Sequence, residues 1–251
     1  MNRILFEPDE ILSDGTVLLT DGRAGHLRQV LRVESDQAVS TGTLDGLAGV
    51  SRVLDISDAG VRLQPEHTAA LPEPWFDLLL AVPRPKVLKR LWPQLAAFGV
   101  GHVVLLNATK VEKCYFSSQW LDPRHYRPLL VEGLMQAGFT RVPQVTIAPR
   151  FKPFIEDDLD VRFSDALRLL AHPGAKGGLP ENAEIRSRRP LLAVGPEGGW
   201  TAYEVERLAE RGFRLFSLGD RILRSDTACI ALIAVLEWAR DAAGCGYTNH
   251  E

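Results

Sequence analysis

The chain of 251 residues has few cysteines, no long apolar run and no lysine among its first 85 positions. Its cysteines, Cys114, Cys229 and Cys245, are odd in number and fit no zinc spacing, so we expect neither a disulfide framework nor a metal site. The longest apolar run, residues 228–236, is far below membrane-spanning length. Acidic residues and a proline at positions 7–10 interrupt any leader-like N-terminus. These absences predict a cytoplasmic protein.

The chain also lacks an excess of basic charge, since its 29 lysines and arginines stand against 32 acidic residues and the formal net charge is −3. Residues 1–72 contain six arginines and eleven acids, which gives −5 for this part. No global basic field therefore indicates nucleic-acid binding, although a local patch would suffice. Any RNA contact in this part must come from a few arginines, for which Arg3, Arg23, Arg28 and Arg32 are the candidates. Their alternative role is that of solvated surface residues.

Residues 1–72 are expected to form a small β-barrel. Short strand-like runs at 17–20, 37–40, 49–56 and 61–64 are separated by turn residues, and Asp45-Gly46 is typical of a hairpin turn. One helix is predicted at residues 26–33, with Leu27, Val30 and Leu31 on one face.

The proline-rich stretch at residues 71–74 predicts a domain boundary, and the hydrophobic period changes after it. From position 73 onward, apolar strand-like runs alternate with helical spacing, which predicts an α/β domain with a mostly parallel sheet. Helices are predicted at 86–98, at 129–137, from about 201 and from about 227. The predicted strands are 75–82, 103–106, 145–148, 167–171, 191–194 and 214–218.

Residues 191–228 contain two glycine-bearing loops that follow consecutive predicted strands. The first loop, GPEGG, precedes a helix that Thr201 and Glu204 should open as a capping box and that Gly212 should end. The second loop spans residues 219–226. Neither loop has the order of a phosphate-binding motif, and Glu197 would repel a phosphate. A cationic or zwitterionic ligand fits better, while a plain tight turn is the alternative for GPEGG alone.

The two loops together resemble those of the RsmE-type 16S ribosomal RNA (uracil-N3)-methyltransferases of the SPOUT class. That family pairs GPEGG with LG-x-R-[IV]-LR-x-x-TA, seen here as LGDRILRSDTA. The HLRQVLR segment at residues 26–32 is similar to another family pattern. The resemblance implies a PUA-like RNA-binding barrel at residues 1–72 and a trefoil-knotted domain at residues 73–251. It also implies a homodimer formed through the C-terminal domain.

The resemblance further implies binding of S-adenosylmethionine between the paired loops. Arg221 and Arg224 would hold phosphate or stabilise a uracil anion, and Glu197 would act as a base or organise its loop. His172 has a second interpretation as a strand-end histidine bonded to backbone. The implied cofactor-binding residues are His172, Val194, Gly195, Gly198, Gly199, Leu218, Gly219, Ile222, Leu223 and Thr227.

RNA contacts are also expected in the C-terminal part. A polar stretch at residues 107–116 contains Lys110 and Lys113 together with Tyr115 and Phe116, which suits phosphate contact with base stacking, although a solvated loop is the alternative. Arg141 begins an Arg-Val-Pro segment that matches the family.

Two segments depart from the family pattern. Residues 97–100 lack a glutamate found in ELGV, and residues 135–139 lack an acid and an arginine found in EQ-x-GR. Three functions therefore stay open: uracil-N3 methylation of 16S RNA, methylation of another RNA or base atom, and a non-catalytic RNA-binding or assembly role.

Overall fold

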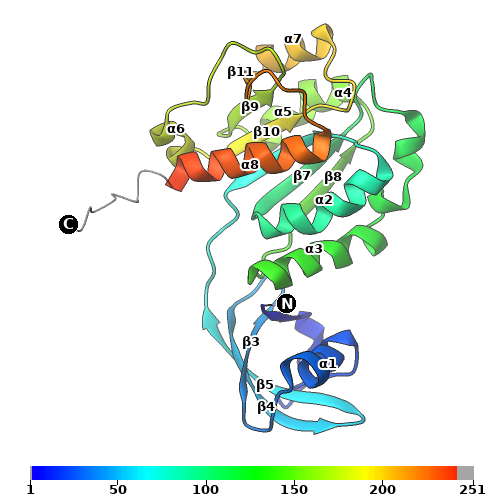
Figure 1. The fold of residues 1–251 in the computed structure, drawn as a ribbon, viewed down its shortest axis with the longest axis vertical. Helices are drawn as coiled ribbons and strands as arrows, with labels where there is room; N and C mark the ends of the chain where they lie inside the picture. The colour runs from blue at the N-terminus through cyan, green and yellow to red at the C-terminus, as the bar shows by residue number, and fades with distance from the viewer. Residues whose placement is uncertain (1, 242–251) are drawn as a thin grey trace, which may run out of the picture.

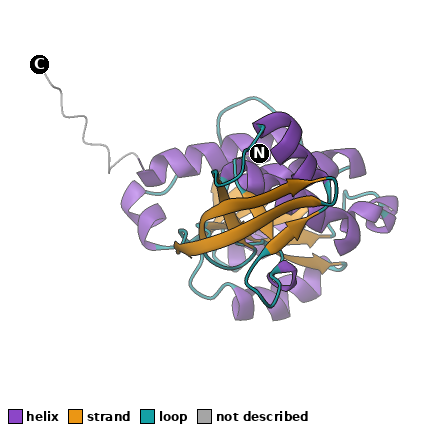
Figure 2. Cartoon of the chain, turned by 90° about the horizontal axis from the view of Figure 1, so that it is seen from below, coloured by secondary structure: helices purple, strands orange, loops and turns teal. Residues whose placement is uncertain are grey.

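A computed structural model describes residues 2–241, which form a small N-terminal lobe and a larger C-terminal lobe (Figure 1). The N-terminal lobe is a curled five-stranded sheet in the order β1-β3-β4-β5-β2, seen from below in Figure 2. The turn predicted at Asp45-Gly46 joins β3 to β4, which pair antiparallel. The strands are β1 (Ile4–Phe6), β2 (Val17–Leu19), β3 (Ala38–Thr43), β4 (Ala48–Ser57) and β5 (Gly60–Ala69).

The helix predicted at residues 26–33 begins earlier and has a different apolar face. It comprises α1 (Gly22–Gly25) and a π-helical segment, η2 (His26–Leu31). Leu27 is buried in the core of the lobe, but 65% of Val30 and 46% of Leu31 are exposed. The prediction of one shared apolar face was wrong, because the wider π-helical turn rotates successive residues differently from an α-helix.

The C-terminal lobe contains a six-stranded, wholly parallel sheet, as the alternating pattern predicts. The strand order is β11-β9-β10-β6-β7-β8. Every residue of β6 and β10 is buried, as expected for central strands of a parallel sheet that is covered on both faces. The strands are β6 (Phe76–Ala81), β7 (Val100–Leu106), β8 (Gln144–Ala148), β9 (Leu167–Ala171), β10 (Pro190–Val194) and β11 (Arg214–Phe216).

The strand order determines which helices cover each face of this sheet. Connections from β6 to β7, β7 to β8 and β9 to β10 move in one direction, whereas those from β8 to β9 and β10 to β11 move in the other. Right-handed crossovers therefore place α2 (Pro85–Ala97), α3 (Pro123–Ala137) and α6 (Asn182–Ser187) on one face. They place α5 (Leu159–Arg162) and α7 (Ala202–Glu210) on the other. In Figure 1, α8 (Ser225–Asp241) lies with α2 and α3 in front.

The other differences from the sequence prediction are local. β1, α6 and the helical segment from α4 (Phe151–Pro153) through η5 (Phe154–Asp158) to α5 were not predicted. β11 ends at Phe216, two residues before its predicted end, and α3 begins at Pro123 rather than at residue 129. Within residues 2–241, no helix is long and apolar enough to cross a membrane.

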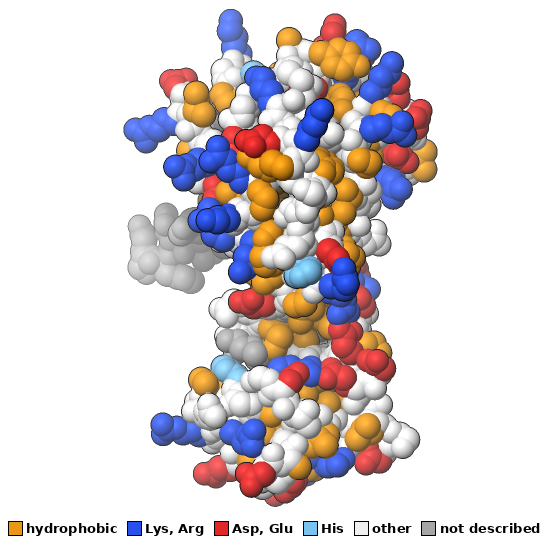
Figure 3. Space-filling view, turned by 90° about the vertical axis from the view of Figure 1, so that its right-hand side faces the viewer, with side chains coloured by type: hydrophobic (Ala, Val, Ile, Leu, Met, Phe, Trp, Pro, Cys, Tyr) orange, Lys and Arg blue, Asp and Glu red, His pale blue; other side chains and the backbone are white. Residues whose placement is uncertain are grey.

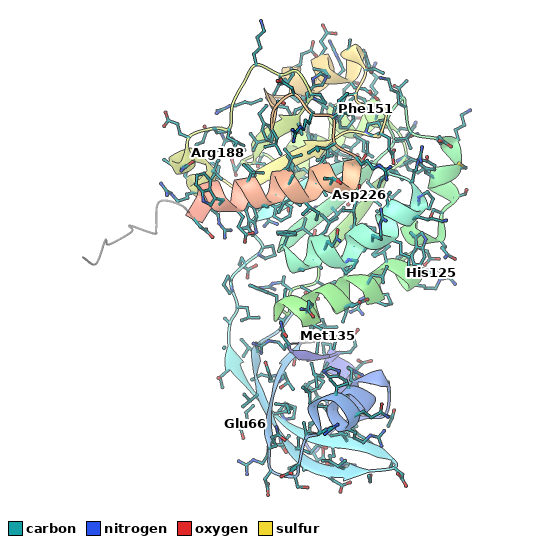
Figure 4. All side chains as sticks on the ribbon, in the orientation of Figure 1. Glu66, His125, Met135, Phe151, Arg188 and Asp226 are labelled. Carbon is teal, nitrogen blue, oxygen red and sulfur yellow. The ribbon has the colours of Figure 1, made fainter. Side chains whose placement is uncertain are left out.

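The two lobes meet at the C-terminal end of α3. The Met135 carbonyl accepts the backbone N–H groups of Asn2 and Arg3, each at 3.0 Å. The Arg3 Nε donates to the Gly138 carbonyl at 2.9 Å, and the Thr140 hydroxyl donates to the Gly46 carbonyl at 2.8 Å. Figure 4 shows Met135 at the end of α3 that faces the N-terminal lobe.

A histidine is built into the sheet near its amino edge. His102, in β7, shares a 2.8 Å hydrogen bond between its Nε2 and the Thr146 hydroxyl, and its ring packs on Phe163. Burial, together with the charges of Arg162 and Arg189, lowers the pKa of His102 to about 4. The folded chain therefore holds this imidazole in its neutral form.

We expect His102 to contribute to loss of stability in acid. The unfolded chain, with an ordinary pKa of 6.5, binds this proton more readily, so the free energy of unfolding falls as pH decreases from 6.5 towards 4. His102→Gln keeps a hydrogen-bonding side chain that does not titrate, and should reduce that pH dependence by on the order of 1–2 kcal/mol. Urea denaturation of the unaltered chain and of His102→Gln, at pH 7 and at pH 4.5, measures this difference in pH dependence. Equal pH dependence in the two proteins would contradict the assignment.

Candidate functional site

A cavity of about 120 Å³ lies at the carboxyl ends of three adjacent strands, β11, β9 and β10. His172 and Pro173 follow β9, the GPEGG loop follows β10, and residues 217–223 follow β11. Side chains near the start of α8 close the fourth side. The carboxyl edge of a parallel sheet is the usual ligand-binding edge, because the connecting loops there leave towards both faces.

The cavity brings together most of the residues that the sequence proposes for cofactor and catalysis. Three candidates do not line it: Gly198, Thr227 and Arg224. Thr227 is exposed in the first turn of α8, and the Arg224 carbonyl accepts the Ala228 N–H at 2.7 Å. The candidates that line it are His172, Val194, Gly195, Glu197, Gly199, Leu218, Gly219, Arg221, Ile222 and Leu223.

Glycines in both loops are required by the backbone or by close packing. Gly199 and Gly219 have φ angles of +70° and +117°, which side chains other than glycine rarely adopt. A Cβ on Gly195 would lie 3.0 Å from the Trp200 Nε1, so the indole closes directly over this glycine. The loops thus expose backbone amides and carbonyls to the cavity, which suits a ligand held largely by main-chain groups.

The mouth of the cavity is apolar. Leu218, Ile222 and Leu223 are all exposed, and 83% of Ile222 is accessible. Arg221 is exposed beside them. Exposed aliphatic side chains next to open main-chain groups suit a flat, partly apolar ligand that carries polar edges.

A buried carboxylate fixes the geometry of the GPEGG loop. Glu204 is 1% exposed and accepts the Thr109 N–H at 2.7 Å, the Thr201 N–H at 2.8 Å and the Thr201 hydroxyl at 2.8 Å. The capping box predicted for Thr201 and Glu204 is confirmed. Because Thr109 follows β7, this one side chain ties the loops after β7 and β10 together. Lys110 adds a second tie, since its Nζ donates to the Gly198 carbonyl at 2.7 Å.

Several basic residues proposed for RNA have intrachain partners. The Arg3 guanidinium donates to the Thr41 carbonyl at 2.7 Å, and that of Arg23 donates to the Leu5 carbonyl at 2.7 Å and pairs with Glu10. Arg141 pairs with Glu73. Arg28 makes one exposed hydrogen bond, to the Ser57 carbonyl. Arg32 and Lys113 are exposed.

A second polar cluster, which the sequence interpretation missed, adjoins the cavity. The Arg84 N–H donates to Glu197 Oε1 at 3.2 Å, and the Tyr115 hydroxyl donates to Glu112 Oε1 at 2.9 Å. Arg84 follows β6, and Glu112 and Tyr115 follow β7. The only sequence feature that could have indicated this cluster is the position of its residues after two consecutive predicted strands. The Tyr115 hydroxyl and the Glu197 and Glu112 carboxylates raise the pKa of Arg84, which stays charged.

The fold and the cavity define an α/β protein with a cavity at the carboxyl edge of a parallel sheet. Residues 71–237 match the model of the RNA methyltransferase domain, and the chain belongs to that family.

Individual relatives agree with this assignment. The chain is 27% identical over 244 residues to ribosomal RNA small subunit methyltransferase E of Treponema pallidum, covering 94% of this chain and 90% of the relative. It is 28% identical to the Synechocystis protein of the same name, with coverage of 92% and 76%. The fold is similar to that of the Neisseria gonorrhoeae methyltransferase E solved with S-adenosyl methionine, with a TM-score of 0.73, 23% identity and coverage of 94% and 97%.

We expect Glu204→Gln to destabilise the chain. A glutamine side chain has one acceptor oxygen where the carboxylate has two, so at least one backbone N–H, of Thr109 or Thr201, loses its partner on this buried side chain, at a cost of about 2 kcal/mol. Glu206→Gln, on the same helix but exposed, should change the free energy of unfolding by less than about 0.5 kcal/mol. Urea denaturation compares the two variants, and equal stability would show that Glu204 does not hold the loops.

Proposed function

We propose that this protein transfers a methyl group from S-adenosylmethionine to N3 of a uridine in the 16S RNA of the small ribosomal subunit, in the cytoplasm. The observation that carries the proposal is the cavity formed by the paired GPEGG and LGDRILRSDTA loops at adjacent strand ends. Membership of the RNA methyltransferase domain family supports the reaction class. Similarity to the ribosomal RNA small subunit methyltransferases E of Treponema pallidum and Synechocystis supports the ribosomal RNA substrate.

The residues that line the cavity fit S-adenosylmethionine. The exposed apolar side chains of Leu218, Ile222 and Leu223 suit the adenine ring, and the main chain of Gly195 and Gly219 can bond the polar edges of the ligand. S-adenosylmethionine supplies a methyl group on a positively charged sulfur. The nearby Glu197 carboxylate favours that charge, in keeping with the absence of a phosphate-binding pattern.

The acceptor needs a path for its proton, because N3 of uracil is protonated at neutral pH. Arg221, which lines the cavity, is suited to stabilise the uracil anion, and Arg224 to bind a neighbouring phosphate. Glu197 is bonded to the backbone of Arg84, which suits a role in organising its loop.

RNA is proposed to lie along both domains, the first at residues 1–72 and the second at residues 73–251. We propose that the curled five-stranded sheet is a PUA-like domain. Arg28, Arg32 and Lys113 are the proposed exposed RNA contacts of the two domains. The other basic candidates are proposed to support the surface around these contacts: Arg3, Arg23, Lys110 and Arg141. In the view of Figure 3, most of the basic side chains lie on the larger lobe.

Two further features of the family are proposed for the C-terminal domain. The first is the trefoil knot, for which the return of the chain from β11, at the sheet edge, to α8 on the opposite face provides support. The second is a homodimer formed through α8, on which 71% of Trp238 is exposed.

The alternatives are methylation of another RNA or base atom and a non-catalytic role. Sequence departures at residues 135–139 favoured a changed acceptor, but these residues bond the N-terminal lobe and none of them lines the cavity. Transfer of tritium from labelled S-adenosylmethionine to small subunits of cells that lack this activity, followed by nucleoside mass spectrometry, separates the functions. We expect 3-methyluridine in 16S RNA; label in another nucleoside supports the first alternative, and cofactor binding without transfer supports the second.

Gly195→Val tests the cavity itself. The added side chain meets the Trp200 indole and enters the ligand space, so we expect S-adenosylhomocysteine to bind at least tenfold more weakly, about 1.4 kcal/mol. Gly178→Val is the matched control, because Gly178 has open space around it. Isothermal titration calorimetry on both variants, with circular dichroism to check folding, measures the effect. Unchanged affinity in a folded Gly195→Val variant would locate the cofactor elsewhere.

A further inference from the structure

The polar cluster of Arg84, Glu112, Tyr115 and Glu197 lies at a particular point of the sheet. β6 and β10 are parallel neighbours, with Leu80 opposite Val194 near their carboxyl ends. The connection that leaves β6 runs over the face covered by α2, whereas the one that leaves β10 runs over the opposite face through α7. Loops that leave adjacent strands in opposite directions open a crevice between them, and such crevices are where parallel sheets bind ligands.

The polar cluster is next to the cofactor cavity and shares one residue with it. The cavity occupies the ends of β11, β9 and β10, and the cluster occupies the ends of β10, β6 and β7. Glu197 belongs to both, since it lines the cavity and accepts the Arg84 N–H at 3.2 Å. A molecule bound over β6 and β7 would therefore face the ligand in the cavity, as in-line methyl transfer requires.

The chemistry of the cluster matches an imide. Uracil presents one N–H donor between two carbonyl oxygens, so its binding site needs an acceptor beside cationic donors. Glu112 supplies a carboxylate and Arg84 a guanidinium that remains charged, and both side chains are exposed. Tyr115, 8% exposed, donates its hydroxyl to Glu112 Oε1 and fixes the carboxylate from below. Burial and the hydrogen bond to Glu112 raise the pKa of Tyr115, so its hydroxyl remains a donor.

We infer that the loops after β6 and β7 form the acceptor-base subsite, in which Glu112 is the catalytic proton acceptor, Arg84 binds a carbonyl oxygen beside N3, and Tyr115 is a positioning residue. This inference rests on the proposed function. The N3 proton passes to Glu112, and the N3 lone pair forms the new bond to the methyl carbon. The carbon–sulfur bond breaks with its electron pair staying on sulfur, which leaves S-adenosylhomocysteine, N-methylated uracil and a protonated carboxyl group.

The first test separates chemistry from cofactor binding. Glu112→Gln should lower kcat for methylation of small ribosomal subunits at least about 100-fold, the usual range for loss of a general base. Its dissociation constant for S-adenosylhomocysteine, measured by calorimetry, should stay within twofold of that of the unaltered chain. The matched control is Glu181→Gln, an exposed glutamate far along the sequence from the loops, which should keep full activity.

The second test distinguishes positioning from a merely structural role. Within its loop, Glu112 accepts the Tyr115 hydroxyl at Oε1 at 2.9 Å, and the Cys114 Sγ lies 3.7 Å from Oε2. Loss of the Tyr115 hydroxyl removes the hydrogen bond that orients the Glu112 carboxylate. Tyr115→Phe should therefore lower kcat about tenfold, while KM for the small subunits and the dissociation constant for S-adenosylhomocysteine stay within about twofold of those of the unaltered chain. Tyr126→Phe, in α3, should keep the full kcat.

Three results would overturn the inference. Full kcat in Glu112→Gln would exclude Glu112 as the proton acceptor. A loss of affinity for S-adenosylhomocysteine as large as the loss of kcat would show that Glu112 supports the fold of the cavity instead. Full kcat in Tyr115→Phe, or a fall in kcat accompanied by an equal loss of cofactor affinity, would remove the positioning role. Failure of the unaltered chain to bind S-adenosylhomocysteine would instead refute the proposed function and the subsite together, before any variant is compared.

Discussion

The parallel pairing of β10 with β6 is the constraint on which the C-terminal lobe depends. It joins the first strand of the sheet to one more than a hundred residues later, and both strands are buried throughout. Burial of a large apolar side chain contributes roughly 1.5–3 kcal/mol, so the summed burial of these two strands exceeds the roughly 0.5–1.5 kcal/mol of a single loop hydrogen bond. The same pairing also brings the loop after β6 beside the GPEGG loop, where the Arg84 N–H donates to Glu197.

Polar contacts then fix loops that apolar packing leaves free. Glu204 bonds backbone from both the β7 loop and the start of α7, so the two loops cannot move independently without leaving a buried carboxylate partly unpaired. Lys110 and Glu197 connect the same group of loops from the exposed side. The hydrogen bonds to the buried Glu204 carboxylate contribute more to stability than the exposed contacts of Lys110 and Glu197, because they are shielded from water. The two exposed contacts adjust the loop conformation.

Sequence predicts this molecule well where a short segment determines its own structure. The apolar runs that became β6 and β10, the Thr201 capping box and the helix end at Gly212 all depend on neighbouring residues. Val30 and Leu31 were misassigned because a π-helical turn cannot be distinguished from an α-helical one by spacing alone. The contact between Arg84 and Glu197 spans 113 positions and exists only through strand order, which no local pattern encodes.

The arginines make the same point about function. From sequence alone, Arg3 and Arg23 are candidates for exposed side chains that contact RNA. In the structure, each instead donates to a backbone carbonyl inside the chain. Arg3 also bonds the Gly138 carbonyl and therefore joins the lobes where the family pattern is lost, at residues 135–139. The contacts that hold the N-terminal lobe there use the main-chain carbonyls of Met135, Gln136 and Gly138, which a change of side chain leaves in place, and these residues are separate from the loops at the carboxyl edge. Orientation of the lobes and chemistry at the sheet edge are thus specified by separate residues, so divergence in one does not require divergence in the other.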